Sequence, residues 1–239
     1  MATKLNIYRL SENAVTIQFG NNISEDMLNI IKAYNSLLHS TPFQGFIATT
    51  PAYATLTVFF DYFTVQEVAG LTGSSCFENV CNYLNKLNEK LTSAAPQVKG
   101  NIIEIPVCYS NEFGTDMAEV STHTRLSACD IVQKHTASVY VVHMIGFIPG
   151  FAYLGGMDEQ LSTPRKKKVN PSTRAGAVGI AGQQTGIYPI ATPGGWQIIG
   201  CTPVTMFDIS NQQPSLLKAG DRVRFKSISK DEFENYTQQ

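Results

Sequence analysis

The stretch Gly176–Asp208, GAVGIAGQQTGIYPIATPGGWQIIGCTPVTMFD, decides the fold of the C-terminal half of the chain. In it, short runs of β-branched and apolar residues alternate with glycine, proline and polar turn residues. From Gly146 to Gly200 the chain places 11 of its 18 glycines in 55 residues, whereas the average glycine content of proteins is about 7%. Many short strands separated by glycine and proline indicate an all-β barrel or sandwich. The strands expected from this pattern are Ala177–Ile180, Ile187–Ile190, Gln197–Ile199, Val204–Phe207 and, later, Arg222–Phe225.

Three further elements are expected upstream of this glycine-rich stretch. Ser138–Ile145 carries apolar residues on both faces, which predicts a central strand. Asn101–Pro106 is expected to form another strand. Between them, Ser127 is followed three residues later by Asp130, a pattern that predicts the capped start of a short helix.

The N-terminal half has a different pattern, in which strands and helices alternate. After Ser24, a favourable helix cap, apolar residues recur at steps of three and four and predict an amphipathic helix. The same spacing predicts a second helix over Val80–Leu91. The four expected strands are Leu5–Leu10, Ala14–Phe19, Phe46–Thr49 and Thr55–Asp61. The order ββαββα predicts a small α+β domain of the ferredoxin-like type.

The two halves are expected to be separate domains. Thr92–Gly100 contains serine, two alanines and proline in sequence and is predicted to link them. We therefore expect residues 1–95 to form the small α/β domain and residues 96–239 to form the β-barrel domain. The last segment, Ser227–Gln239, is expected to be a weakly ordered tail.

The composition of the chain argues against a general nucleic-acid binder, a secreted protein and a membrane-spanning protein. The 239 residues carry 18 basic and 19 acidic side chains, so the basic surplus of a general nucleic-acid binder is missing. Hydrophobic residues make up 43% of the chain, which is enough for a sizeable core. No secretory signal is readable, and the most apolar window, Val139–Phe151, is too interrupted by glycine and proline to span a membrane. Five cysteines without metal-ligand spacing indicate reduced thiols and no metal site, so we expect a soluble, cytoplasmic protein.

The loop Gly146–Phe151 is the first candidate for a ligand site. It follows the expected central strand, and its glycines could bring backbone N–H groups close to an anion or a carbonyl group. A tight strand exit in a barrel would use the same residue types. The candidate residues in this loop are Gly146, Pro149, Gly150 and Phe151.

The loop Gly182–Pro189 is the second candidate, because it combines side-chain amides, a hydroxyl and a phenol with flexible backbone. Such groups could hydrogen-bond a small polar ligand at several points, although a hairpin turn explains the two glycines equally well. The candidate residues are Gln184, Thr185 and Tyr188.

The third candidate loop surrounds Trp196, the only tryptophan of the chain. A lone tryptophan beside proline and two glycines could form the wall of a binding site or simply fill the core of the barrel. The candidate residues in this loop are Pro193, Gly194, Gly195 and Trp196.

Arg165–Lys168 is the only basic run. Such runs are usually solvated, but Arg165 follows Thr163-Pro164 and is the member expected to be held in place, where its guanidinium would suit a carboxylate or a phosphate. His143 is a further candidate, although a lone histidine on an apolar strand face is more often a core or interface residue. Because the sequence has no Ser-His-Asp set and no carboxylate pair at a recognisable spacing, the catalytic residues stay unknown.

Several strings of the sequence resemble the B-subunit family of 5-oxoprolinase, formerly labelled allophanate hydrolase subunit 1, which includes the sporulation kinase A inhibitor. These strings are HTASVYVVHMIGFIPGFAYLGG (residues 135–156), STPRKKK (162–168), the whole of Gly176–Asp208, and AGDRVRF (219–225). The resemblance is dense from Ile103 to Phe225 and continues more thinly upstream, so it covers essentially the whole chain.

The resemblance implies a cyclophilin-like β-barrel after a small α/β domain. It also implies a partnership with the A and C subunits of 5-oxoprolinase in the ATP-dependent opening of 5-oxo-L-proline to L-glutamate, an activity expected only in the complex. ATP, with Mg²⁺, would then be bound by the complex rather than by this chain alone. The rival interpretation is a non-enzymatic inhibitor with the same fold, which would dock on a sensor histidine kinase.

At three positions the sequence differs from the residues that are frequent in the family. These differences concern the basic side chains that are expected to line a ligand pocket. His143 stands where an aromatic residue is frequent, Asn170 replaces a frequent arginine, and Thr173-Arg174-Ala175 stands where Val-Pro-Ala is common.

Overall fold

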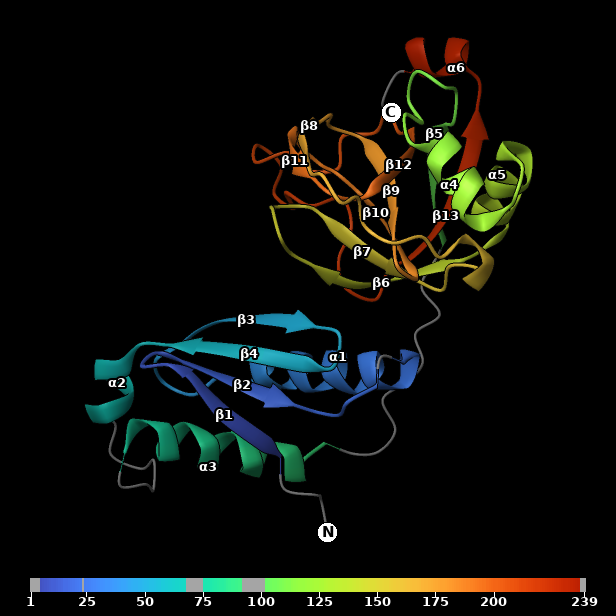
Figure 1. Ribbon diagram of the computed structural model, residues 1–239. Helices are drawn as coiled ribbons and strands as arrows, with labels where there is room; N and C mark the ends of the chain where they lie inside the picture. Colours follow the sequence, from blue (N-terminus) through green and yellow to red (C-terminus); the bar gives the residue numbers. More distant parts are fainter. Residues whose placement is uncertain (1–4, 23, 68–74, 92–101, 237–239) are drawn as a thin grey trace. The chain divides into compact units, whose positions relative to one another are not determined.

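The computed structural model describes residues 5–22, 24–67, 75–91 and 102–236. The chain divides into two compact units, Met1–Val98 and Lys99–Gln239 (Figure 1). Each unit has a hydrophobic core of its own. The predicted linker, Thr92–Gly100, lies outside the described residues, so the domain limits of 1–95 and 96–239 stay a prediction.

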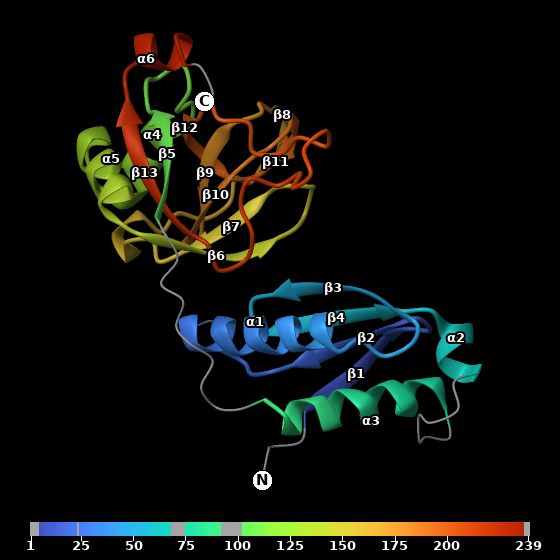
Figure 2. The same cartoon turned by 180° about the vertical axis from the view of Figure 1, so that it is seen from behind.

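The N-terminal unit is a four-stranded antiparallel sheet with helices. Strands β1 (Asn6–Ser11), β2 (Ala14–Gln18), β3 (Phe46–Ala52) and β4 (Thr55–Phe60) are arranged in the order β1-β2-β4-β3. The helices are α1 (Glu25–Ser40), α2 (Tyr62–Glu67) and α3 (Cys76–Glu89), all visible in Figure 2. The predicted strands and both long helices are present, whereas the short helix α2 was not predicted. The ferredoxin-like assignment stays a prediction.

Local sequence signals explain where the two long helices begin, and one hydrogen bond joins the two helices. The Ser24 hydroxyl accepts a hydrogen bond from the N–H of Met27 at 3.1 Å, as expected of a helix cap, and Ser75 caps α3 in the same way. The two helices contact each other, because the hydroxyl of Tyr34 in α1 donates to the carbonyl of Leu84 in α3 at 2.7 Å.

The C-terminal unit is built on a closed barrel. Its strands are β5 (Ile102–Cys108), β6 (Tyr140–Ile145), β7 (Ala152–Gly155), β9 (Ala177–Ala181), β10 (Gln184–Ile187), β12 (Gln197–Cys201) and β13 (Arg222–Ile228). They close in the order β10-β7-β6-β13-β5-β12-β9, and β13 pairs with β5 in parallel while the other pairs are antiparallel. The prediction of a barrel is confirmed, and closure leaves these strands without a free edge.

Smaller elements surround the barrel in Figure 1. A two-stranded sheet joins β8 (Asn170–Thr173) to β11 (Thr192–Gly194). The remaining elements are α4 (Met117–Thr124), α5 (Ala128–Ala137), the 3₁₀ turn η1 (Glu159–Leu161) and α6 (Lys230–Glu234). Ser127 and Asp130 form the predicted capping box at the start of α5. Among the described helices, none combines the length and apolarity needed to cross a membrane.

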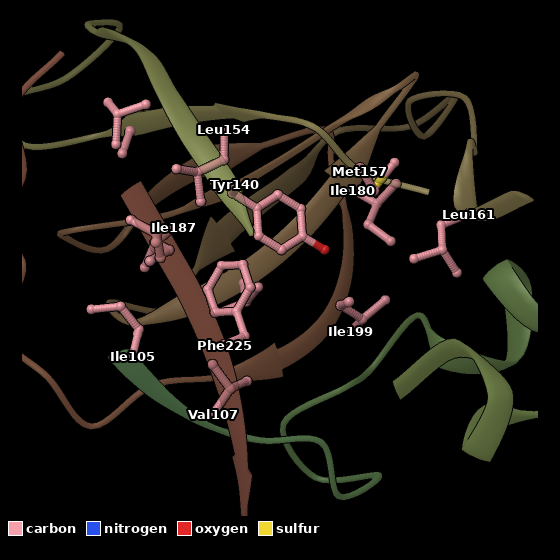
Figure 3. Packing of buried hydrophobic residues seen from close by; sticks show 14 of the residues in the cluster. Ile105, Val107, Tyr140, Leu154, Met157, Leu161, Ile180, Ile187, Ile199 and Phe225 are labelled. Atoms are coloured by element: carbon pink, nitrogen blue, oxygen red, sulfur yellow. The ribbon is translucent and has the colours of Figure 1, made fainter. Parts of the chain in front are cut away.

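The barrel interior is filled by side chains, so it is a packed core. Figure 3 shows the rings of Tyr140 and Phe225 beside each other, with isoleucines around them, and their ring centroids are 5.2 Å apart. Both rings are at most 1% exposed. The predicted ligand site is therefore expected outside this core.

Three expected elements differ from the structure. The predicted strand Ile187–Ile190 is wrong, because β10 ends at Ile187; Pro189 has no N–H to continue the ladder. Val204–Phe207 does not form a strand either, although Met206 within it is buried in the barrel core. The expected tail is ordered over its described part, because β13 runs to Ile228 and a capping box at Ser229 starts α6.

Candidate functional site

A cavity of about 210 Å³ opens in the C-terminal unit, outside the barrel core. It is lined by the turn after β6, the start of β7, the segment before β8, the residue after β10, strand β11 and the β11–β12 connection. Seven predicted site residues meet in it: Phe151, Arg165, Tyr188, Pro193, Gly194, Gly195 and Trp196. Phe147, Tyr153 and Val169 also line it and were not among the predicted site residues.

Buried aromatic rings form the walls of the cavity. Phe151 and Tyr188 are 1% exposed and Trp196 is 5% exposed. The ring of Phe151 stands edge-on to both others, with centroid distances of 5.1 Å to Tyr188 and 5.4 Å to Trp196. Such rings lose little conformational freedom when a ligand binds, so the walls are rigid and preformed.

One cation gives the cavity its polarity. Among the described residues that line it, Arg165 is the one charged side chain, and its guanidinium carbon lies 6.0 Å from the ring centroid of Trp196. Burial raises the pKa of Tyr188; the hydrogen bond from the Trp196 backbone N–H and the positive charge of Arg165 oppose that rise. Burial also raises the pKa of Tyr153, again opposed by Arg165. Both phenols are therefore protonated near neutral pH and lie within the electrostatic reach of Arg165.

The segment that carries Arg165 is fixed on both sides. The carbonyl of Pro164 accepts from the Gln197 side-chain amide at 3.1 Å, and the backbone N–H of Lys166 donates to the carbonyl of Gly195 at 2.8 Å. The ammonium of Lys166 also pairs with Asp116 at 2.6 Å. Arg165 itself is exposed, so its anchoring comes from its neighbours.

In the basic run, Arg165 was the residue expected to be held in place, but the side chain of Lys166 is also held, by its ion pair with Asp116. Its partner Asp116 is 8% exposed, and the second carboxylate oxygen accepts from the backbone N–H of Ile198 at 2.8 Å. The side chains of Lys167 and Lys168 are exposed, as expected for a basic run. Asp116 lies 50 residues from Lys166 in the chain, so no local pattern could have revealed the pair.

Gly194 is required by the close packing at the floor of the cavity. A Cβ atom at this position would lie 2.6 Å from the Tyr188 hydroxyl oxygen and 2.7 Å from Oγ1 of Thr173. Both distances are below ordinary van der Waals contact, so only glycine lets the backbone approach these groups. At Gly195 a Cβ atom would meet only Val169, at 3.8 Å.

The turn after β6 contributes side chains to the cavity and uses two of its backbone donors internally. The N–H of Gly146 donates to the carbonyl of Phe151, and the N–H of Phe151 donates to the carbonyl of Ile148, both at 3.1 Å. Gly150 has a φ of +82° and packs against Phe207. Gly146, Pro149 and Gly150 therefore shape the turn, and none of these three lines the cavity.

The remaining candidates lie away from the cavity lining. His143 in β6 is half-buried and packs against Gly155, and Gln184 is half-buried in β10. Arg174, which stands in a departure from the family pattern, places its guanidinium 4.8 Å from the ring centroid of Phe113. Asn170 uses its side-chain oxygen to accept from the N–H of Ser172.

Thr185 belongs to a buried hydrogen-bond network in the barrel. Its hydroxyl lies 3.0 Å from Nε2 of His135 and donates to the carbonyl of Gly179 at 2.9 Å. Nδ1 of His135 lies 2.7 Å from the hydroxyl of Tyr109, and the imidazole stacks on Phe225. Burial lowers the pKa of His135 from 6.5 to about 3, so the ring is neutral.

We expect the free energy of unfolding to fall as the pH falls below about 6.5, because of His135. Between pH 6.5 and about 3 the unfolded chain binds a proton there that the folded chain does not. The loss should be about 1.4 kcal/mol per pH unit, or ~2 kcal/mol at pH 5. Urea titrations from pH 7 to pH 5 measure it. His135→Gln should flatten the profile, whereas His123→Gln, at an exposed position of the same unit, should leave it as in the wild type; equal slopes for both variants would contradict this assignment.

No group of three or more histidine, cysteine, aspartate or glutamate side chains that could hold a metal ion is found among the described residues.

Comparisons with known proteins identify relatives over nearly the whole chain. A family model described as carboxyltransferase domain, subdomain C and D, matches residues 5–217. The B subunit of the Bacillus subtilis 5-oxoprolinase is 43% identical over 241 residues, which cover 100% of this chain and 99% of that protein. The B subunit of the Haemophilus influenzae 5-oxoprolinase is 38% identical, with coverage of 92% of this chain and 97% of the relative.

Two solved structures show the same fold within longer chains. The crystal structure of TTHA0988 has a TM-score of 0.75 and 32% identity, and the match covers 90% of this chain but only 40% of that one. The urea amidolyase of Kluyveromyces lactis has a TM-score of 0.77 over 98% of this chain and 15% of its own length. At 16% identity, the second likeness concerns the fold alone.

Proposed function

Because this chain belongs to the B-subunit family of 5-oxoprolinase, we propose that it is one subunit of an ATP-dependent 5-oxoprolinase. The reaction opens 5-oxo-L-proline to L-glutamate, and the A and C subunits are the partners. We expect the complex to work in the cytoplasm, where ATP is available. We also assign the N-terminal unit to the ferredoxin-like type and the barrel to the cyclophilin-like type.

The chemistry explains why ATP is needed. A lactam is stabilised by resonance, so water attacks its carbonyl carbon slowly at neutral pH. Transfer of a phosphoryl group from ATP to the amide oxygen would make that carbon a better electrophile. Water then adds to that carbon and the C–N bond breaks, with a proton passing to the nitrogen, which gives γ-glutamyl phosphate. A second water hydrolyses this acyl phosphate to glutamate and inorganic phosphate. The enzyme must hold the substrate carboxylate, the amide oxygen and the phosphates of ATP together.

The single observation that carries the assignment of the site is an aromatic cavity with one guanidinium. Its volume of about 210 Å³ lies below the roughly 300–1,000 Å³ typical of pockets for drug-sized ligands, which favours a small molecule. We assign the carboxylate of 5-oxoproline to Arg165, with the phenols of Tyr153 and Tyr188 as further donors. The ring would then lie against Phe151 and Trp196.

We propose that ATP and Mg²⁺ are bound mainly by the partner subunits. The cavity offers one cation, while ATP carries about four negative charges that normally meet a cradle of backbone N–H groups, a lysine and a metal ion. The described residues contain no cluster suited to a metal ion. The active site would accordingly be composite, and this chain would supply the pocket for the cyclic amide.

The test is glutamate release from 5-oxo-L-proline and ATP by the purified chain, by the partner subunits, and by the reconstituted complex. We expect activity only in the complex, because no self-contained catalytic set is readable in the sequence. Release of glutamate by the chain alone would disprove the composite site. An inactive complex, together with inhibition of a sensor kinase by the chain, would favour the rival inhibitor instead.

A further inference from the structure

Phe147 combines three unusual properties in the turn after β6. Its φ is +73°, which makes it one of three non-glycine residues with positive φ in the described part of the chain. Its side chain is 62% exposed, although it is large and apolar. It nevertheless lines the cavity, so the ring lies at the rim, partly over the pocket and mostly in solvent.

Folding alone does not account for a phenylalanine at this position. A left-handed backbone is unfavourable for a residue with a bulky side chain, and glycine would adopt it without strain. Gly150 does so in the same turn, at φ +82°. Exposure of most of the ring also forgoes the gain from apolar burial. Strained residues of this kind cluster at ligand sites, where the strain positions a side chain.

The strained backbone directs the ring onto the wall of the pocket. The centroids of Phe147 and Phe151 are 5.7 Å apart, and the two rings are nearly perpendicular, at 84°. Phe151 in turn contacts Tyr188 and Trp196 edge-on. Phe147 thus extends the aromatic wall outwards and reaches the rim, where a bound ring would otherwise face water.

We propose that Phe147 is a specificity-determining residue that covers the methylene edge of a small cyclic amide and limits the ring size accepted. This inference rests on the proposed function for the identity of the substrate. Binding would bury the exposed face of Phe147 against the two ring CH₂ groups while the carboxylate lies at Arg165. A six-membered lactam carries one more methylene, which would press against Phe147.

The test compares Phe147→Gly, which removes the ring and suits the backbone, with Phe147→Tyr, which keeps the ring. We expect Phe147→Gly to raise KM for 5-oxo-L-proline in the reconstituted complex about tenfold, with kcat within about twofold. Its preference for 5-oxo-L-proline over 6-oxopiperidine-2-carboxylate should fall at least fivefold, roughly the effect of one methylene in a pocket. Phe147→Tyr, which keeps the ring, should keep the wild-type preference between the two ring sizes.

The thermal midpoint separates this role from a structural one. Phe147→Gly should melt at or above the wild-type temperature, because the strain is relieved. A lower midpoint with an unchanged preference between the two ring sizes would mean that Phe147 only supports the turn, and would overturn the inference. Unchanged KM and preference in Phe147→Gly would overturn it as well.

A binding measurement distinguishes failure of this inference from failure of the proposed function. Trp196 is the only tryptophan and lines the cavity, so its fluorescence reports titration of the full chain with 5-oxo-L-proline. Weaker binding by Phe147→Gly beside an inactive wild-type complex would refute the function and uphold the role of Phe147. If the wild-type complex is active but Phe147→Gly and Phe147→Tyr bind 5-oxo-L-proline with equal affinity, the role of Phe147 is refuted while the proposed function stands.

Discussion

Replacement of Arg165 by alanine is expected to lower kcat/KM of the reconstituted complex at least tenfold and to leave the thermal midpoint of the chain unchanged. Loss of a charge-assisted hydrogen bond to a bound carboxylate costs roughly 1.5–3 kcal/mol, or one to two decades in catalytic efficiency. Before substrate binds, Arg165 is exposed at the cavity, so its removal affects the fold little. Steady-state kinetics of the complex and thermal melts of the chain measure the two effects.

Lys167 supplies the matched control for Arg165. It lies two residues further along the same segment, and its side chain is exposed outside the cavity lining. Lys167→Ala should change stability by less than about 0.5 kcal/mol and leave the activity near that of the wild type. If both substitutions change kcat/KM by the same small amount, Arg165 is only a solvated surface charge, and the assignment of the substrate carboxylate to Arg165 is wrong.

Trp196→Ala is expected to lower the free energy of unfolding by ~3–5 kcal/mol, the usual cost of removing a large buried side chain. Trp196 is 5% exposed and packs in a cluster with Phe151, Tyr188 and Ile198, so its removal leaves a void. Denaturant titration followed by circular dichroism measures the loss, because the variant has no tryptophan fluorescence.

The control for this prediction is Trp196→Phe, which keeps an aromatic ring in the cluster. It should lower the free energy of unfolding clearly less than Trp196→Ala does. The sequence left open whether Trp196 fills the core or forms the wall of a binding site. Trp196 packs in the buried cluster and also lines the cavity, whose role as a binding site stays a prediction. An unfolding free energy of Trp196→Ala equal to that of the wild type would show that the residue serves the cavity only.

The features that the sequence predicted correctly depend on residues close together in the chain. The helix caps at Ser24 and Ser127 are contacts between residues three apart, so local sequence is sufficient to reveal them. The barrel was predictable because glycine and proline separate short apolar runs along one continuous stretch. The same local composition singled out Gly195 and Trp196 as site candidates; both line the cavity, and their role in binding stays a prediction.

The features that local sequence could not reveal depend on contacts between distant segments. Tyr153 and Phe147 line the cavity only because β7 and the turn before it lie beside the loops at Arg165 and Gly194. Conversely, the sequence suggested Thr185 as a ligand-binding hydroxyl in a loop, but it lies in strand β10, where it is buried against His135.

Contiguous strings of the sequence are therefore sufficient to reveal the family, the two-part pattern of elements, the barrel and most of the aromatic and glycine residues of the cavity. Which candidates share one cavity, and how Arg165 is held there, follow from the folded structure. Asp116 forms an ion pair with Lys166 across 50 residues of chain, and its second carboxylate oxygen accepts a hydrogen bond from the backbone N–H of Ile198 in β12. The physical reason is that pairing between strands sets these distances, and strand pairing follows the register of the whole barrel rather than the identity of any neighbouring residue.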